Sequence, residues 1–223
     1  MSRPVVVARG LRKRYGSGTA MVTALDGIDV DIVAGELLAI SGRSGSGKTT
    51  LLHCLSGVTT PDAGIVTFDG IDVTAASDEQ RSDLRARRMA FVFQHLNLLP
   101  ALTVAENVEL PLVLRGDNAD GIRSASAAVL EQVGLGDRGV ASPSELSGGE
   151  QQRAAVARAL IGEPEVIWAD EPTGALDSAT SAEVMGLLRK AADGGRTVVV
   201  VSHAPDVAAV ADRVLTMRDG RIV

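Results

Sequence analysis

The stretch Gly42-Arg43-Ser44-Gly45-Ser46-Gly47-Lys48-Thr49 fits the pattern G-x-x-x-x-G-K-[ST], a loop that binds phosphate groups. The apolar run Leu37–Ser41 precedes the loop and predicts a buried strand. Residues Thr50–Ser56 follow it with helical character, and Gly57 is suited to end that helix. A strand, a glycine-rich loop and a helix are the context that this motif requires, so the stretch predicts a nucleotide site.

The residue types of this loop suit a triphosphate. Glycines let the backbone approach phosphate oxygens closely, and the start of the following helix adds positive potential. Lys48 is expected to reach the β- and γ-phosphates, and the Thr49 hydroxyl is expected to bind Mg²⁺. The residues expected to contact the nucleotide here are Gly42, Arg43, Ser44, Gly45, Ser46, Gly47, Lys48, Thr49 and Thr50.

Composition narrows the class of protein. The chain has 223 residues, of which 45% are hydrophobic, and this favours a globular protein with a substantial core. A net charge of −6 makes nucleic acid a poor candidate for the main partner. No long apolar run predicts a membrane span or a secretion signal, so we expect a cytosolic location or the cytosolic face of a membrane. The single cysteine, Cys54, is expected to be a buried packing residue.

Residues before and after the loop are rich in strand formers. The segments 4–9, 22–32 and 64–70 predict an antiparallel sheet beside the strand 37–40. Tyr15 lies near the end of the first of them and has two interpretations, a ring that stacks on adenine or a ring that packs on the sheet edge.

A second part of the core follows. Ser77 to Gln80 is a capping box that predicts a helix over 78–88, and Met89–Phe93 predicts a buried strand. Gln94 ends that strand, where it either faces a ligand or is an ordinary surface glutamine.

From Leu96 to Ile161 the sequence pattern changes to one that predicts helices separated by loops. Thr103 to Glu106 is another capping box, and Pro111 is expected to kink the helix that it starts. We expect a loop over 116–121, a helix over 122–133 and irregular structure over 134–144. The absence of any strand pattern predicts a helical segment inserted into an α/β core.

The segment Leu146–Arg153, here called the signature segment, opens an alanine-rich helix that runs to about Ile161. Ser147, Gly148 and Gly149 lie where the N–H groups of a helix are unpaired, which makes a second end able to bind an anion. The alternative is a plain serine cap without a ligand. Two such ends for one nucleotide suggest that the second end serves the nucleotide of another molecule.

Two later strands end in polar groups. The strand 165–169 ends at Asp170 and Glu171, a pattern that supplies a carboxylate for Mg²⁺ and a second acid placed to deprotonate a water. The strand 197–202 ends at His203, which either faces the same site or is structural. Asp219-Gly220 predicts a tight turn in a hairpin at the end of the chain.

Along its full length the sequence resembles the nucleotide-binding domain of ATP-binding cassette (ABC) transporters. The order of P-loop, Gln94, signature segment, acidic strand, Asp177 loop and His203 matches that family throughout. The resemblance is greatest to the branch of lipoprotein-release, macrolide-export, haem-export and cell-division ATPases. It is carried by Phe91–Gln94, Leu98–Pro100, Leu102-Thr103, Glu106–Val108 and Ala169–Asp177.

The resemblance implies a fold and a division of the chain. The fold would be α/β, a P-loop NTPase (RecA-like) core with an antiparallel β subdomain and an inserted α-helical subdomain. Residues 1–94 and 162–223 would form the core with the β subdomain, and residues 95–161 the helical subdomain with the signature segment.

The resemblance also implies an ATPase of two copies, joined head to tail around two ATP molecules with Mg²⁺. Ser147 and Gly149 of one copy would meet the P-loop of the other, and Asp177 would couple the two sites. Within one copy, the implied roles are Tyr15 on adenine, Thr49, Gln94 and Asp170 at Mg²⁺, Glu171 as general base and His203 at the γ-phosphate. Ala204 departs from the family, which often has an acid at that position.

The implied partner is a membrane permease that docks near Gln94 and Leu98–Pro100 and holds the chain at the cytoplasmic face of the membrane. Signalling across the membrane, as in the cell-division members, is the alternative to transport. A chromosome-type ATPase would need a long coiled coil and a ribosome-acting type two cassettes, and this chain has neither. A GTPase or small kinase would leave the signature segment unexplained.

Overall fold

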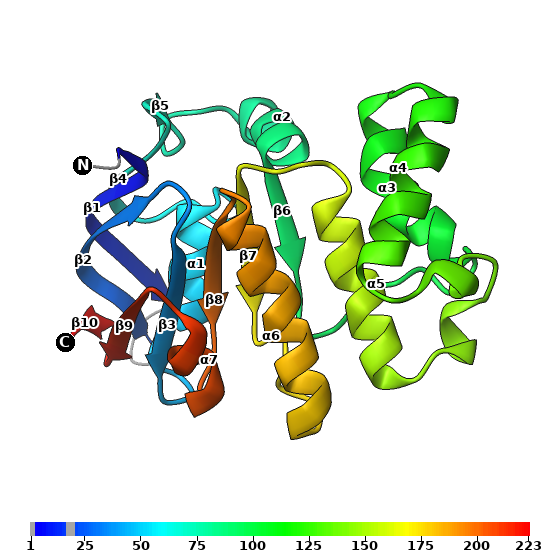
Figure 1. Ribbon diagram of the computed structural model, residues 1–223. Helices are drawn as coiled ribbons and strands as arrows, with labels where there is room; N and C mark the ends of the chain where they lie inside the picture. The colour runs from blue at the N-terminus through cyan, green and yellow to red at the C-terminus, as the bar shows by residue number, and fades with distance from the viewer. Residues whose placement is uncertain (1–2, 17–20) are drawn as a thin grey trace.

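Two sheets organise the chain in Figure 1, a computed structural model that describes residues 3–16 and 21–223. The first sheet is antiparallel, with the strand order β2-β1-β4-β5. Its presence beside the P-loop strand confirms the predicted antiparallel patch. Its strands are β1 (Pro4–Tyr15), β2 (Val22–Val33), β4 (Ala63–Phe68) and β5 (Ile71–Asp72).

The second sheet has the order β10-β9-β3-β8-β7-β6. Its strands from β9 to β6 are parallel, and β10 pairs antiparallel with β9 at one edge. The carboxyl ends of parallel strands meet at one edge of a sheet, which is where ligands bind in open α/β sheets. The strands are β3 (Leu37–Gly42), β6 (Met89–Val92), β7 (Val166–Asp170), β8 (Thr197–Val201), β9 (Arg213–Arg218) and β10 (Arg221–Ile222).

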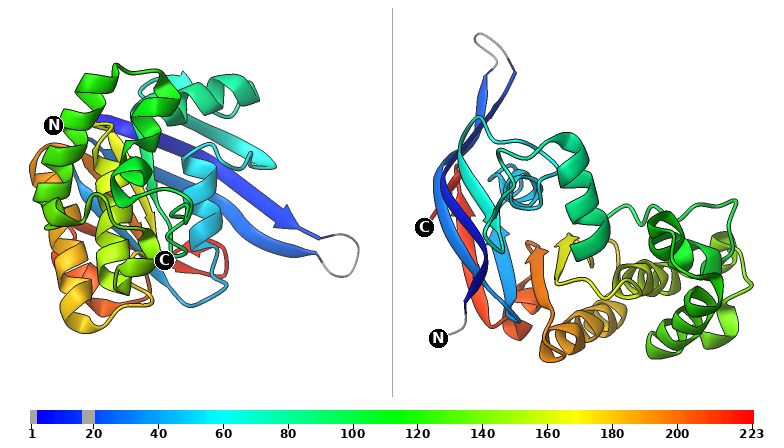
Figure 2. Two further views of the ribbon diagram at one scale, coloured as in Figure 1. Left: turned by 90° about the vertical axis from the view of Figure 1, so that its right-hand side faces the viewer. Right: turned by 90° about the horizontal axis from the view of Figure 1, so that it is seen from above.

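Alternate residues of the central strands enter two separate hydrophobic clusters, because successive side chains of a strand point to opposite faces. Leu38 and Trp168 pack with α1 (Lys48–Leu55) and the antiparallel sheet. Leu37 and Ile167 pack on the other face, with α5 (Gly148–Leu160) and α6 (Ser178–Asp193). Figure 2 shows the antiparallel sheet on one side of the parallel sheet and α6 on the other.

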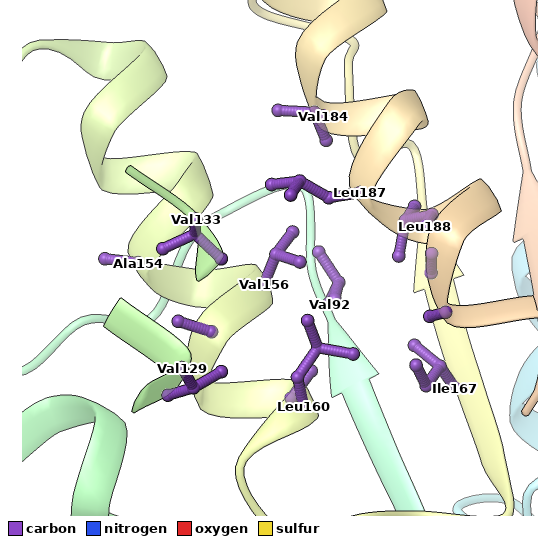
Figure 3. Packing of buried hydrophobic residues seen from close by; sticks show 14 of the residues in the cluster. Val92, Val129, Val133, Ala154, Val156, Leu160, Ile167, Val184, Leu187 and Leu188 are labelled. Carbon is purple, nitrogen blue, oxygen red and sulfur yellow. The ribbon is translucent and has the colours of Figure 1, made fainter. Parts of the chain in front are cut away.

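The helical segment packs into the same hydrophobic cluster as Leu37, Ile167, α5 and α6. It contains α3 (Val104–Arg115), α4 (Ala119–Gln132) and α5. In Figure 3, Val129 and Val133 from the end of α4 approach Val156 and Leu160 of α5, which in turn face Val92 of β6. The absence of strands from this segment is as expected, and the signature helix is thereby packed directly on the core.

The predicted helix starts were correct where a capping box marked them. α2 (Asp78–Arg88) begins after Ser77 and α3 after Thr103, each with both capping-box hydrogen bonds. α1 ends before Gly57, whose φ of 67° is the left-handed conformation expected there.

Two expectations for local structure were wrong, and one helix was missed. α4 begins three residues before the predicted start at 122, because the Asn118 side chain accepts a hydrogen bond from the Asp120 N–H and caps the helix. The stretch expected to be irregular contains two 3₁₀ turns, η2 (Gly136–Arg138) and η3 (Pro143–Glu145). The short helix α7 (Pro205–Val210) was not expected.

The final hairpin forms at the predicted turn, where Asp219 and Gly220 have φ of 50° and 75°. Cys54 is buried as predicted, and burial raises the pKa of its thiol to about 11. Among the described residues, no helix has both the length and the apolar character needed to cross a membrane.

Candidate functional site

The loop between β3 and α1 leaves the N-terminus of α1 without a capping side chain, and we call this the open start of α1. The N-cap of α1 is Gly47, which has a φ of 100° and offers no side-chain cap, and no acidic residue lies in the first turn. A Cβ at Gly47 would lie 2.2 Å from the Ala24 carbonyl oxygen, so only glycine fits between the loop and β2. The first N–H groups of α1 are therefore free to bind an anion.

Lys48 is held inside this loop. Its Nζ donates hydrogen bonds to the carbonyls of Gly42 and Arg43, at 2.9 and 3.1 Å, and the residue is buried. The loop is thus folded around an ammonium group. An anionic ligand would replace the two neutral carbonyls with charge-assisted partners.

A pocket of about 660 Å³ joins the loop to other strand ends. Gln94 follows β6, Glu171 follows β7 and His203 follows β8, so three residues predicted from separate strands meet the P-loop at one edge of the sheet. Val22 and Ala24 of β2 close one side of the pocket, and no sequence signal marks them. The lining residues from the loop are Arg43, Ser44, Gly45, Gly47, Lys48, Thr49 and Thr50.

Thr49 and Asp170 form a pair of oxygen groups in this region. The Thr49 hydroxyl donates to Asp170 Oδ1 at 3.0 Å. Burial raises the pKa of Asp170, and the hydrogen bond from Thr49 opposes that shift. A hydroxyl, a carboxylate and the nearby Gln94 amide are the hard oxygen donors that suit Mg²⁺, which takes its remaining ligands from phosphates and water. The described residues contain no cluster of three or more histidine, cysteine or acidic groups for a metal.

Glu171 and His203 form a second pair. Glu171 Oε1 lies 2.9 Å from His203 Nδ1, while Oε2 is buried without a hydrogen-bond partner among the described residues. The backbone of Glu171 has a φ of 47°, an unfavourable conformation for a residue with a side chain, and its N–H donates to the Val201 carbonyl at 2.9 Å. Glu171 thus lines the pocket from a strained backbone position and has one carboxylate oxygen without a hydrogen-bond partner among the described residues, which suits it to accept a proton from water.

Tyr15 lies at the end of β1 and is 45% exposed. It pairs with Val22, a pocket residue, but is not itself among the residues that line the pocket. Lys13 Nζ lies 5.6 Å from the centre of its ring. The exposed ring next to the pocket rim is compatible with either interpretation of this residue.

The signature segment is not part of this pocket. Ser147 and Gly149, at the start of α5, and Asp177, at the start of α6, are absent from its lining. α1 and α5 pack on opposite faces of the parallel sheet, and Figure 1 shows them well apart. The structure therefore brings the predicted residues together as two groups within one chain.

The second group is connected through Thr180, which the sequence analysis missed. The Thr180 hydroxyl donates to Asp177 Oδ2 at 2.8 Å, and a Cβ at Gly149 would lie 2.4 Å from Thr180 Cγ2. Arg153 of α5 and Glu183 of α6 are also paired, at 2.8 Å. The starts of α5 and α6 are thereby fixed to each other, and only the Asp177–Thr180 spacing at a helix start signals this in the sequence.

Comparison with known proteins gives a family and several relatives. Residues 25–174 match the family model described as ABC transporter. The chain is 47% identical over 221 residues to the macrolide export ATP-binding/permease protein MacB of Nitrosomonas europaea, and 46% identical over 220 residues to that of Brucella melitensis. These alignments cover 99% of this chain but 34% of each relative, so the chain spans about a third of their length.

Solved structures of cassettes share the fold. The dimeric post-hydrolysis state of the ATP-binding cassette MJ0796, bound to ADP and Pi, is 38% identical with a TM-score of 0.90, covering 97% of this chain and 96% of that one. CbiO1 from Clostridium perfringens, part of the ABC transporter complex cbiONQ, is 31% identical with a TM-score of 0.89, covering 99% and 87%.

Proposed function

This chain belongs to the ABC transporter family, and from that membership we propose that it is an ATP-hydrolysing subunit that drives a membrane permease. The observation that carries the proposal is the division of the predicted site into two groups. One group surrounds the P-loop, and the other lies at the starts of α5 and α6. A site that is incomplete within one chain is completed by a second copy, and a relative of the same fold is dimeric with ADP and Pi bound.

In this dimer, two copies associate head to tail around two ATP molecules. Lys48 and the open N–H groups of α1 hold the phosphates of one ATP, and Ser147 and Gly149 of the partner copy close over its γ-phosphate. Asp177 is linked to this pair because Thr180 donates a hydrogen bond to Asp177 and packs against Gly149. We keep residues 95–161 as the helical subdomain that carries this second group, and residues 1–94 and 162–223 as the core.

The P-loop group supplies the chemistry. Glu171 accepts a proton from the attacking water, His203 holds Glu171 and contacts the γ-phosphate, and Gln94 positions the water. Thr49, Asp170 and Gln94 would hold Mg²⁺, which neutralises charge on the phosphates when bound. Tyr15 stacks on adenine. The products are ADP and inorganic phosphate, and their release separates the two copies.

The permease is proposed to dock beside the loop that follows β6. Phe93 lines an apolar groove whereas its neighbour Gln94 lines the nucleotide pocket, so one short segment borders both sites. Docking near Gln94 and Leu98–Pro100 would hold this chain peripherally at the cytoplasmic face. The ATP-binding/permease character of the MacB relatives supports transport over signalling.

Purification from membranes tests the proposal. The Glu171→Gln chain, tagged and isolated with ATP and Mg²⁺ after mild detergent treatment, is expected to bring down a second copy and one integral membrane protein. The wild-type complex should hydrolyse ATP faster than the isolated chain. If no membrane protein is recovered, the proposed permease partner is contradicted. If the wild-type complex does not hydrolyse ATP, the proposed ATPase activity is contradicted.

A further inference from the structure

The last residues of β1 form a face that leads from the core to the rim of the nucleotide pocket. Leu11, Lys13 and Tyr15 lie at alternate positions of the strand, and the residues between them are exposed. Alternate side chains of a strand point to the same side of a sheet. Leu11 is fully buried in the cluster that contains α1, the Lys13 side chain is 16% exposed, and Tyr15 is 45% exposed. Lys13 therefore lies between the core and the Tyr15 ring.

Lys13 is fixed in this position by the loop that follows α1. Its Nζ donates to the Thr60 carbonyl at 2.9 Å and to Asp62 Oδ1 at 2.8 Å. Asp62 also holds the backbone of β1, because its Oδ2 accepts from the Arg14 N–H at 2.7 Å and its own N–H donates to the Arg12 carbonyl at 2.8 Å. The hydrogen bond to Asp62 raises the pKa of Lys13, so the ammonium group remains charged at neutral pH.

The anchored ammonium group lies over the Tyr15 ring, with Lys13 Nζ 5.6 Å from the ring centre. A cation at this distance is attracted to the negative face of an aromatic ring. An exposed tyrosine at the end of a strand otherwise exchanges between rotamers, and the loss of that freedom opposes the binding of a ligand. A cation fixed on one face of the ring restricts the ring before a ligand arrives.

Lys13 is not placed to bind the phosphates itself. It is absent from the lining of the nucleotide pocket, whereas Lys48 is part of that lining. Its donors are directed to Thr60 and Asp62, and the Asp62 carboxylate offsets its charge. The route from Lys13 to the nucleotide is therefore through Tyr15, whose cross-strand neighbour Val22 lines the pocket.

We propose that Lys13, anchored by Asp62, is a positioning residue for base recognition, which holds the Tyr15 ring so that the face opposite the ammonium group stacks on adenine. The inference rests on the proposed role of Tyr15 and adds the residues that prepare its ring. Base recognition then depends on Lys13, and phosphate binding does not.

Two ligands separate these contributions. ADP contains the base and is not consumed by hydrolysis, and inorganic pyrophosphate offers phosphates without a base. Isothermal titration calorimetry measures the affinity of the full chain for each. We expect Lys13→Met, which keeps the length of the side chain and removes its charge, to weaken ADP binding about threefold. Pyrophosphate binding should stay within about 1.5-fold of wild type, and Lys13→Arg, which keeps a cation, should bind ADP within the same limit.

Arg14→Met is the matched control. It removes the same charge one position along the strand, from an exposed side chain between Lys13 and Tyr15. A change in the general electrostatic attraction of phosphate would alter ADP and pyrophosphate binding equally, so the ratio of the two affinities should equal that of wild type. A fall in this ratio is expected for Lys13→Met and not for Arg14→Met.

A double-mutant cycle tests whether Lys13 acts through the ring. In a Tyr15→Ala background, Lys13→Met should change ADP affinity by less than about 1.5-fold, because the ring that it positions is absent. Unchanged ADP affinity in Lys13→Met, equal losses of ADP and pyrophosphate, or a threefold loss that persists with Tyr15→Ala would each overturn the proposal.

Retained pyrophosphate binding shows that a variant is folded. If Lys13→Met does not fold, Lys13→Gln carries the same expectations, since its amide can still donate to the Thr60 carbonyl.

The proposals fail in different ways. If wild type binds neither ADP nor pyrophosphate, the nucleotide site is contradicted. If Tyr15→Ala binds ADP as wild type does, the adenine role of Tyr15 is contradicted, and the role of Lys13 with it. If Tyr15→Ala weakens ADP binding and Lys13→Met does not, only the role of Lys13 is contradicted.

Discussion

Two helix starts in this chain, those of α1 and α5, are built in opposite ways. α1 begins at a glycine that provides no side-chain cap, and its first turn has no acid. α5 begins at Ser147, whose hydroxyl accepts from the Glu150 N–H while the Glu150 carboxylate accepts from the Ser147 N–H, at 3.3 and 2.9 Å. One start is left open and the other is capped by its own chain.

This difference between the starts of α1 and α5 suggests that they bind phosphate under different conditions. The open start of α1 is ready for phosphate in a single chain, and Lys48 is already in place beside it. The start of α5 is stable without a ligand, and hydrogen bonds from Ser147 hold the pKa of Glu150 below its usual value. In the proposed dimer, this start would bind an anion only when a second molecule presents a phosphate. We expect substitutions at the first start to abolish binding or chemistry in each copy, and substitutions at the second to act on assembly.

The largest effect is expected at the wall of the P-loop pocket. Glu171→Gln should slow ATP hydrolysis by roughly 10²–10⁴-fold, since it removes a general base while keeping the size of the side chain. ATP binding should persist and the ATP-bound dimer should accumulate, as measured by phosphate release and light scattering. Glu79→Gln, an exposed change on α2, is the control and should hydrolyse ATP normally. Rapid turnover by Glu171→Gln would remove Glu171 as the base.

Removal of the charge inside the loop should have the next largest effect. Lys48→Ala is expected to weaken ATP binding by the single chain by about 100-fold, because charge-assisted bonds to phosphate each contribute about 1.5–3 kcal/mol. Titration with a fluorescent ATP analogue measures the change. Lys190→Ala on the surface of α6 should bind as wild type does. Unchanged affinity in Lys48→Ala would mean that the open start binds no triphosphate.

A change at the capped start should leave binding intact and prevent assembly. Ser147→Arg is expected to keep the ATP affinity of the single chain within about twofold and to weaken ATP-dependent dimerisation at least tenfold, about 1.4 kcal/mol. Sedimentation in the Glu171→Gln background measures both species. Ser144→Arg, at an exposed serine in η3, should still dimerise. Loss of ATP affinity in the Ser147→Arg monomer would contradict the separation of the two starts.

The smallest effect is expected at the rim of the open site. Tyr15→Ala should weaken ATP binding by about 5- to 10-fold, the lower part of the range for stacking of an aromatic ring on a base. Tyr15→Phe should restore the affinity. If Tyr15→Ala binds ATP normally, the ring packs on the sheet edge and does not contact adenine.

The sequence predicts those features that depend on a few adjacent residues. The capping boxes at Ser77 and Thr103 fix helix starts through bonds made within four residues, and both predictions were confirmed. Membership of the ABC transporter family, inferred from the order of motifs, was confirmed by the family match. The roles assigned to individual site residues stay predictions.

Features that depend on distant parts of the chain were not predictable in the same way. The early start of α4 was missed for a different reason: its cap at Asn118 is local, but it lies within a run of loop-forming residues. The contact of Gly149 with Thr180 joins residues of two helices that lie about 30 positions apart in the sequence. Such relations follow from packing, which the local sequence does not specify.

The claim that two copies share each site is tested most directly by mixing two defective chains. Lys48→Ala keeps an intact α5 start and Ser147→Arg keeps an intact P-loop, both in the Glu171→Gln background. Neither chain alone should form an ATP-dependent dimer, whereas the mixture should form a dimer with one chain of each kind and one complete site. Dimers of Ser147→Arg alone, or no mixed dimer under ATP, would contradict the shared site.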